Sequence, residues 1–280
     1  TEEMSSESRA RSLGYVAIAS SVGAGAAVAA LPLADTADGA WRLLYVLSLA
    51  WLPVAFVLQK NVRETVRFVR VQTIADAART AKVSRSRFTT QVVAAFLTSV
   101  FIGSASVYLV NYLRDVRNYD ALGVSLFTIG TALPAGAGLI LGGRLADLRG
   151  RRIAGAASLA VGSLLVAASY ATSGATMWLA EMIGGVCLGI AHPALGVYRG
   201  EMFPTARRSG GAATVTASNL IGGSVGLILA GQLLDAGWSY ARVMRMLALA
   251  PLIVSVLVVV SFPETAHREL EEISPDDAGA

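Results

Sequence analysis

The sequence is poor in charged residues. Only 15% of its 280 residues are Asp, Glu, Lys or Arg, whereas 54% are hydrophobic and the mean hydropathy is +0.59. A soluble domain carries about 25% charged residues, so this composition predicts a protein that lies in a lipid bilayer. The net charge is +4 and the pI is about 9.5, but the basic residues cluster between apolar runs, which argues against nucleic acid as a partner.

Residues and motifs for several kinds of chemistry are also missing. The chain has one cysteine, Cys187, so a disulfide framework is excluded, and we expect Cys187 to be a small core residue. The apolar runs hold no Ser–His pair, no HExxH motif and no pair of aspartates, which argues against an intramembrane enzyme. Because no Gly-x-x-x-x-Gly-Lys phosphate loop is present, ATP-driven transport is not supported, and we expect no cofactor.

The sequence does contain long apolar runs, each close to the length of a membrane-spanning helix. The runs are separated by short polar segments, and the fourth run is expected to be interrupted at Pro134. The pattern predicts an all-α integral membrane protein with eight transmembrane helices. The predicted spans are residues 12–34, 43–59, 88–110, 121–143, 153–172, 176–198, 210–234 and 246–262.

The distribution of Lys and Arg predicts the orientation of these spans. Cytoplasmic loops of membrane proteins carry an excess of basic residues, and eight spans put both termini of this chain on the basic, cytoplasmic side. We expect the membrane to be the bacterial plasma (inner) membrane. Only five of the 23 basic residues fall on the opposite side, namely Arg42, Arg114, Arg117, Arg242 and Arg245.

The most informative stretch lies between the fourth and fifth spans. We expect a tight turn at the cytoplasmic face, in which Gly143 and Gly150 let the backbone turn sharply. Asp147 is then free to point at a helix amino terminus or at another arginine. A basic turn that only sets topology accounts for the arginines but not for the order of the residues. That order is Gly143, Leu145, Ala146, Asp147, Gly150, Arg151, Arg152.

This order closely resembles the signature loop of the major facilitator superfamily (MFS) of secondary transporters. The resemblance implies two six-helix halves that face each other across a central cavity. It also implies that Asp147 is a gate latch, whose expected partner is the amino terminus of the first span, and that Glu201 pairs with Arg151 or Arg144 in the same layer. The residues expected to form this gate are Gly143, Asp147, Gly150, Arg151, Arg152, Glu201, Arg208 and Arg9.

The chain also repeats itself at an offset of about 200 residues, which indicates a repeat unit of six spans. Together with the resemblance, the repeat implies that the chain holds the last two helices of an N-terminal half and a complete C-terminal half. The chain therefore looks truncated, lacking the first four helices. The recurring pairs are Glu3-Met4 with Glu201-Met202, Trp41 with Trp238, and Glu64-Thr65 with Glu264-Thr265.

The longest polar stretch, residues 60–87, is the best domain boundary. Val62, Val66 and Val69 recur at helical spacing, with arginines between them, which is typical of a helix that lies on the cytoplasmic membrane surface. We divide the chain into residues 1–59, the last two helices of the N-terminal half; 60–87, a basic linker; 88–263, the six-helix C-terminal half; and 264–280, an acidic cytoplasmic tail.

One predicted span carries most of the candidates for a substrate or proton path. Glu181 is the only acidic residue inside a span, and such a carboxylate is a functional candidate unless it only reaches interfacial water. His192 and Arg199 follow on the same helix face, which suits a cavity or a proton path; a hydrogen-bonded packing histidine is the alternative. Asn219 and Tyr108 are candidates to meet a polar substrate, although such residues more often join helices.

These features predict a secondary active transporter of a small polar metabolite, of the sugar or organic acid class. We expect coupling to protons and alternating access by rocking of two helical halves. The segments at Glu201 and Glu264 resemble the sugar-porter and metabolite-symporter branches. The first span ends in Leu31-Pro32 and lacks the Gly-Pro-x-x-Gly-Gly pattern of drug–proton antiporters, which favours uptake.

Two alternatives stay open. One is a transport-incompetent fragment or a sensor on the same fold, and the other is efflux of a drug or metabolite by proton antiport. In every case the expected partners are the lipid bilayer, a small solute and, for a transporter, protons.

Overall fold

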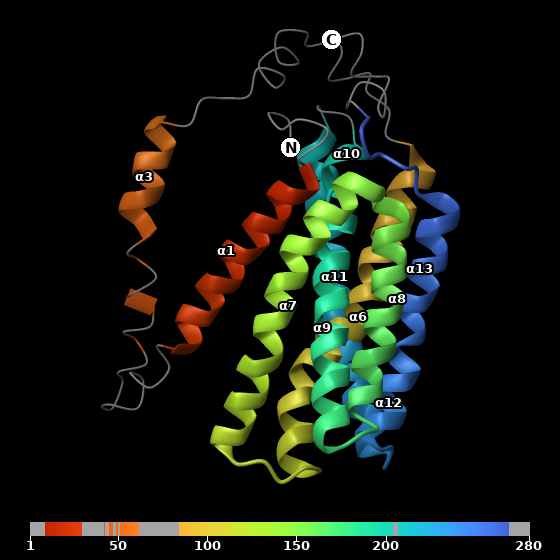
Figure 1. The fold of residues 1–280 in the computed structure, drawn as a ribbon. Helices are drawn as coiled ribbons and strands as arrows, with labels where there is room; N and C mark the ends of the chain where they lie inside the picture. Colours follow the sequence, from red (N-terminus) through yellow and green to blue (C-terminus); the bar gives the residue numbers. More distant parts are fainter. Residues whose placement is uncertain are drawn as a thin grey trace, which may run out of the picture.

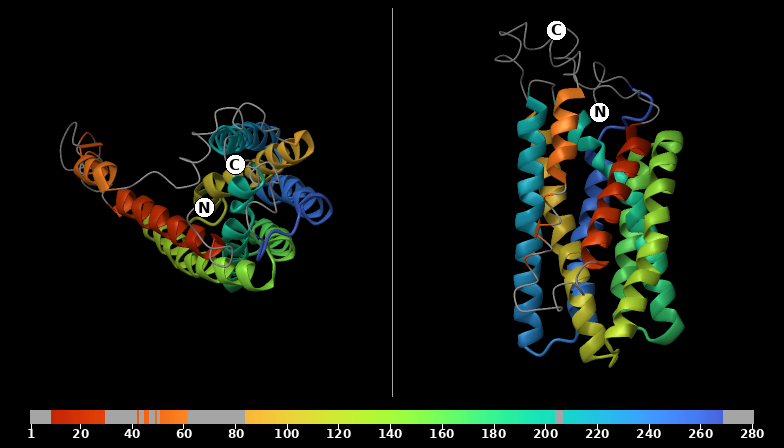
Figure 2. Two further views of the ribbon diagram at one scale, coloured as in Figure 1. Left: turned by 90° about the horizontal axis from the view of Figure 1, so that it is seen from above. Right: turned by 90° about the vertical axis from the view of Figure 1, so that its left-hand side faces the viewer.

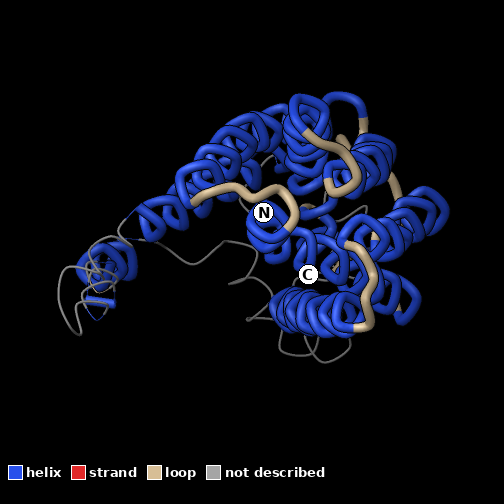
Figure 3. The backbone as a smooth tube through the Cα atoms, turned by 90° about the horizontal axis from the view of Figure 1, so that it is seen from below, coloured by secondary structure: helices blue, strands red, loops and turns tan. Residues whose placement is uncertain are grey.

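All the regular structure in the described part of the chain is helical (Figure 3). Residues 62–83 make up most of the predicted linker, residues 60–87, and residues 269–280 make up most of the predicted tail. Both segments lie outside the described residues, as do the side chains of Arg9 and Arg208. The computed structural model describes residues 9–29, 42, 45–46, 49, 51–61, 84–203 and 207–268.

Six helical segments among the described residues are long and apolar enough to cross a membrane. They correspond to the last six of the eight predicted spans. The first two predicted spans overlap the helices α1 (Arg9–Ala29) and α3 (Trp51–Asn61), which are not among the six. The six are α6 (Arg85–Asp115), α7 (Ala121–Arg149), α8 (Arg151–Ser169), α9 with α10 (Gly174–Gly196, Tyr198–Glu201), α11 (Arg208–Asp235), and α12 with α13 (Tyr240–Leu247, Leu249–Ser261).

The helices α6 to α13 form one bundle and run roughly side by side (Figure 1). Helix α9 packs against both α7 and α8, α6 packs against α11, and α13 packs against α6 and α8. Helix α1 lies along α7 at one side of the bundle, and α3 stands apart from it (Figure 2). The start of α1 and the end of α13 lie at the same end of the bundle as the junction of α7 and α8, which we call the arginine-rich end.

Glycines let the helices of the bundle approach each other closely. A Cβ atom added at Gly142 of α7 would lie 2.5 Å from the Cα atom of Ile190 in α9. A Cβ atom at Gly222 of α11 would lie 2.3 Å from the carbonyl oxygen of Phe96 in α6. Because lipid tails are as apolar as the helices, close packing of this kind holds transmembrane helices together.

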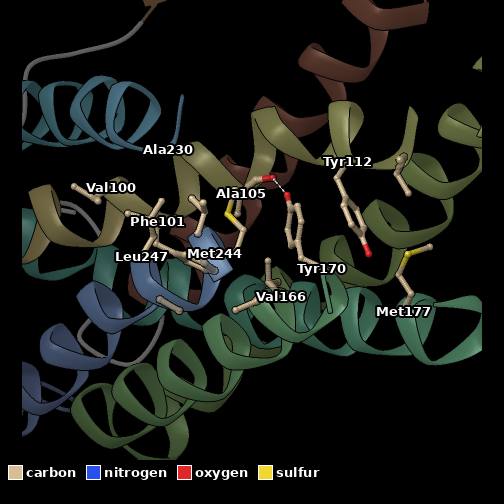
Figure 4. Packing of buried hydrophobic residues seen from close by; sticks show 14 of the residues in the cluster. Val100, Phe101, Ala105, Tyr112, Val166, Tyr170, Met177, Ala230, Met244 and Leu247 are labelled. Carbon is tan, nitrogen blue, oxygen red and sulfur yellow. Dashed lines mark hydrogen bonds between the residues drawn. The ribbon is translucent and has the colours of Figure 1, made fainter. Parts of the chain in front are cut away.

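Aliphatic, aromatic and sulfur-containing side chains pack together in one cluster of the bundle (Figure 4). The rings of Tyr112 and Tyr170 are 4.8 Å apart, and the Tyr170 hydroxyl donates a hydrogen bond to the carbonyl oxygen of Ala105. Met177 and Met244 pack in the same cluster. Since the tyrosine hydroxyl finds a partner, the cluster holds α6, α8 and the start of α9 together without leaving a buried polar group unpaired.

The outer surface of the bundle is apolar. On α7, Leu122, Leu126, Ile129 and Leu133 are 57–72% exposed, and their spacing of three and four residues puts them on one face of the helix. Soluble proteins rarely expose apolar patches of such extent. Surrounding hydrocarbon covers such a face, in agreement with the membrane protein predicted from composition.

The junction between α7 and α8 differs from the predicted turn. Helix α7 runs on to Arg149 and α8 begins at Arg151, so Gly150 alone is non-helical, with φ of 101°. Positive φ costs glycine little, which allows a turn of one residue. Span five therefore begins at Arg151 and not at residue 153.

Two further predictions about the helices also differ from the structure. Helix α7 continues through Pro134 without interruption, because neighbouring groups in a membrane bundle can satisfy the carbonyl that proline leaves free. The last span begins at Tyr240 and not at residue 246, as the Ser239 hydroxyl accepts a hydrogen bond of 3.4 Å from the N–H of Arg242 and so starts α12. Because this part of the sequence is polar, the hydrophobic pattern did not predict that the helix begins here.

The substitution Gly142→Ala should destabilise the bundle by about 1–3 kcal/mol, because the new methyl group would overlap the backbone of α9. Thermal unfolding in detergent measures this effect. Gly136→Ala, on the same helix, is the matched control, since nothing lies within 4 Å of its added Cβ atom. Equal melting temperatures for the two variants would contradict the close approach of α7 and α9.

Candidate functional site

Asp147 connects α7 to the amino terminus of α1. This residue lies near the end of α7 and is 2% exposed. Its carboxylate accepts hydrogen bonds from the backbone N–H groups of Ala10, at 3.1 Å, and Arg11, at 2.9 Å. The first N–H groups of a helix have no partner within the helix and carry the positive end of its dipole. Asp147 therefore caps α1, and the contact predicted from the sequence is present.

Gly143 serves close approach and not a turn. It lies within helix α7, one turn before Asp147. A Cβ atom at this position would lie 2.6 Å from the Cα atom of Arg11. A side chain here would hold α1 away from α7 and move its first N–H groups out of reach of Asp147.

Arg151 is the centre of a buried charge cluster. Its guanidinium donates to both carboxylate oxygens of Glu201, and the two residues are completely buried. It also donates to the carbonyl oxygen and the hydroxyl of Thr265, at 3.2 and 3.1 Å, and lies 3.5 Å from Asp147. Of the two partners predicted for Glu201, the structure has Arg151, while the side chain of Arg144 is exposed.

Glu264, just after α13, caps the amino terminus of α8. Its carboxylate accepts from the N–H groups of Arg151 at 2.9 Å, Arg152 at 3.1 Å and Ala266 at 3.0 Å. Burial alone would raise the pKa of this carboxyl group, but these hydrogen bonds and the Arg151 guanidinium outweigh burial and hold the pKa below its ordinary value. A Cβ atom at Gly150 would lie 2.8 Å from this carboxylate. Glycine is therefore needed at this position both for its positive φ and for the close approach of the carboxylate.

Sequence reasoning did not place Glu264 and Thr265 in this cluster. A signal was available, because the internal repeat matches Glu64-Thr65 with Glu264-Thr265. Of the predicted gate residues, Arg152 takes part through its backbone N–H group. The side chains of Arg9 and Arg208 lie outside the described residues, so their predicted roles remain predictions.

A cavity of about 1220 Å³ lies between α1, α6, α7 and α9 and reaches the start of α11. Glu181, His192 and Arg199 all line it, as expected for residues on one face of α9 and its continuation α10. His192 is exposed to the cavity, and Glu181 and Arg199 are half-buried. Far from Arg199, at the other end of α9, the Glu181 carboxylate accepts a hydrogen bond of 2.8 Å from the Ser169 hydroxyl.

A second cavity of about 340 Å³ lies within the bundle, between α6, α8, α9, α11 and α13. Asn219 lines it, and its side-chain oxygen lies 3.5 Å from the donating hydroxyl of Ser99. His192 and Arg199 line both cavities. Tyr108, the remaining path candidate, lines neither cavity and instead donates to the carbonyl oxygen of Leu227 at 3.2 Å, so it joins α6 to α11.

Among the described residues, no group of three His, Cys, Asp or Glu side chains is placed to hold a metal ion. The site thus consists of a charge cluster that links helix ends and of two cavities whose walls are mostly apolar and carry several polar side chains. It offers carboxylate, imidazole, guanidinium and amide groups for binding, hydrogen bonding and proton transfer.

Comparison with known families matches residues 91–278 to the model of the Major Facilitator Superfamily. The chain belongs to the Major Facilitator Superfamily. It is therefore an integral membrane protein and a secondary transporter, and not an enzyme. A comparison with curated protein sequences found no match.

Solved structures agree on the fold. The MFS proton:xylose symporter XylE bound to 6-bromo-6-deoxy-D-glucose is similar to this chain, with a TM-score of 0.78 and 15% sequence identity. The similarity covers 98% of this chain and 68% of the symporter chain. At this identity the comparison shows an MFS fold and leaves the substrate open.

The Glu264 cap should make stability depend on pH in the acidic range. Because the pKa of Glu264 is lower in the folded protein than its ordinary value of 4.5, its contribution is present above pH 4.5 and is lost as the pH falls through the folded-state pKa. The variant Glu264→Gln lacks this contribution. We expect the difference in melting temperature between wild type and variant to shrink as the pH falls below 4.5. A difference that stays constant would contradict the cap.

Proposed function

We propose that this MFS protein carries a small polar metabolite, of the sugar or organic acid class, across the membrane together with protons. The observation that carries the proposal is the large cavity in which Glu181, His192 and Arg199 lie along one helix face. The other polar side chains of the cavity are serine and threonine hydroxyls, so these three groups are the ionisable ones among its lining residues that could select a polar solute. The basic residues around Arg151 support an orientation with the arginine-rich end in the cytoplasm.

The contact between Asp147 and α1 supports a role as a gate latch. Each hydrogen bond from a backbone N–H group to a charged carboxylate is worth about 1.5–3 kcal/mol. Two such bonds are strong enough to favour a closed state and weak enough to be replaced by water when the helices part. Arg151 and Glu201 join α8 to α10 within the bundle, so opening would separate α1 from α7 and leave the bundle intact.

Glu181 is the proposed proton carrier. The groups that face it are the hydroxyl of Ser169, which donates to it, and Tyr170, with which it interacts electrostatically. Neither group carries a positive charge. A carboxylate inside a membrane span is a functional candidate, and its ability to bind and release a proton suits coupling to a pH gradient.

Efflux of an apolar or amphipathic solute by proton antiport is the second candidate. It is favoured by the apolar character of most of the cavity wall, which includes Val16, Phe101, Leu139 and Val166. Transport assays in vesicles of both orientations distinguish the two directions.

The variant Asp147→Asn should reduce transport by the full-length protein in vesicles at least several-fold, with unchanged expression, because the amide lacks the charge that holds α1. Radiolabelled solute uptake with an imposed pH gradient measures this effect. Asp235→Asn, at the exposed end of α11, is the matched control and should transport normally. Undiminished uptake by Asp147→Asn would remove the latch role.

The variant Glu181→Gln should abolish accumulation driven by a pH gradient while solute exchange across the membrane continues. The amide preserves the contact with Ser169 but cannot exchange a proton. Gradient-driven uptake and equilibrium exchange are compared in the same vesicles. Retained gradient-driven uptake would show that protons, if coupled, use another group.

A further inference from the structure

Arg199 is a cation inside the bundle that no acidic side chain of the described residues contacts. It lies next to the arginine-rich end, in the short helix α10, and is half-buried. Within the described part of the chain, its guanidinium makes no hydrogen bond or ion pair. Glu201, two residues later, is already bound by Arg151. Glu181 is 18 residues away along the helix, which corresponds to about 27 Å.

Gln91 is a second buried polar group without a full set of partners. It lines the smaller cavity from α6, is 4% exposed, and donates through Nε2 to the sulfur of Met202 at 3.1 Å. Its Oε1 atom is buried and accepts no hydrogen bond. A buried acceptor of this kind costs about 1–3 kcal/mol when it is left unpaired, so a ligand with a hydroxyl group would relieve the cost.

Two further polar side chains of the smaller cavity offer hydrogen-bond donors. Asn219 uses its side-chain oxygen with Ser99, which leaves its amide N–H groups to donate to a ligand. The imidazole of His192 offers at least one further N–H donor. At about 340 Å³, the cavity has the size of a site for a small molecule.

We propose that the smaller cavity is a binding site for a small hydroxycarboxylate, with the carboxylate on Arg199 and a hydroxyl group on Gln91. The planar guanidinium matches a carboxylate with two parallel hydrogen bonds. One guanidinium balances one negative charge. A phosphate group carries about 1.5–2 negative charges and would therefore remain partly uncompensated. His192 and Arg199 line both cavities, so the proposed site borders the larger cavity. The inference rests on the proposed function only for its link to transport.

The test measures binding to the purified full-length protein in detergent by isothermal titration calorimetry. The probes are sodium gluconate and sodium lactate, with sorbitol as the neutral counterpart of gluconate and inorganic phosphate as the competing oxyanion. We expect at least one carboxylate to bind, sorbitol to show no measurable binding, and phosphate to bind more weakly. The proposal is overturned if neither carboxylate binds, or if sorbitol or phosphate binds as tightly as the better carboxylate.

The variants separate a ligand site from a structural role. Arg199→Gln should weaken carboxylate binding by roughly 10- to 100-fold, and Arg199→Lys should retain part of the affinity. Gln91→Leu should weaken gluconate more than lactate, which has fewer hydroxyl groups. Arg245→Gln, on the exposed side of α12, is the matched control and should bind as wild type does.

Thermal unfolding without ligand provides the second readout. A cation without a protein partner contributes little to stability, so Arg199→Gln should melt no lower than wild type. Carboxylate binding that is unchanged in Arg199→Gln, or a variant that melts well below wild type, would overturn the site.

Transport is measured separately on the same preparation. A protein that transports a neutral sugar but binds no carboxylate would overturn this inference and leave the proposed function intact. Carboxylate binding without any transport would overturn the proposed function alone.

Discussion

Arg151 is the group on which the arrangement of helix ends depends. Moving a guanidinium out of water costs several kcal/mol, and the cost is offset only when carboxylates and hydrogen-bond acceptors surround it. Here Glu201, Asp147 and Thr265 do so, each from a different segment of the chain. Removing either partner of such a buried pair typically costs 3–5 kcal/mol, because the remaining charge stays buried. The ends of α7, α8, α10 and α13 are therefore fixed relative to one another.

The cluster around Arg151 lies in a firmly held bundle, to which helix α1 is attached less firmly. The bundle from α6 to α13 is held by close glycine contacts, by the aromatic cluster around Tyr112 and Tyr170, and by Arg151. Helix α1 is held at its amino terminus by hydrogen bonds to Asp147. Asp147 belongs to both parts, since it contacts Arg151 and caps α1. A transporter that alternates between two states needs such a contrast, in which rigid bodies meet at contacts that can be broken.

The cavities follow from the same packing. Small residues let α7, α9 and α1 approach closely, and side chains of the same helices line the larger cavity. Among the residues that line the larger cavity, the ionisable ones are Glu181, His192 and Arg199. Arg199 and His192 line both cavities, so the charge selection proposed for them would act beside the apolar wall of the larger cavity.

The sequence was sufficient for those features that local pattern controls. Low charge and long apolar runs identified a membrane protein, and helical spacing put Glu181, His192 and Arg199 on one face of a single span. The order of residues around Asp147 identified the family and two contacts that the structure contains. These features were predictable because period, length and motif are properties of neighbouring residues along the chain.

Other features were decided by tertiary structure. Glu264 caps α8 although more than 100 residues separate it from Arg151, and the sequence does not state which helix end a carboxylate will reach. Helix α7 continues through Pro134 because neighbouring groups satisfy the free carbonyl. The single-residue turn at Gly150 depends on the groups that pack closely against its backbone. Tyr108 joins helices while Arg199 faces two cavities, because a side chain's surroundings are set by which helix packs against its face, and only the folded bundle determines that.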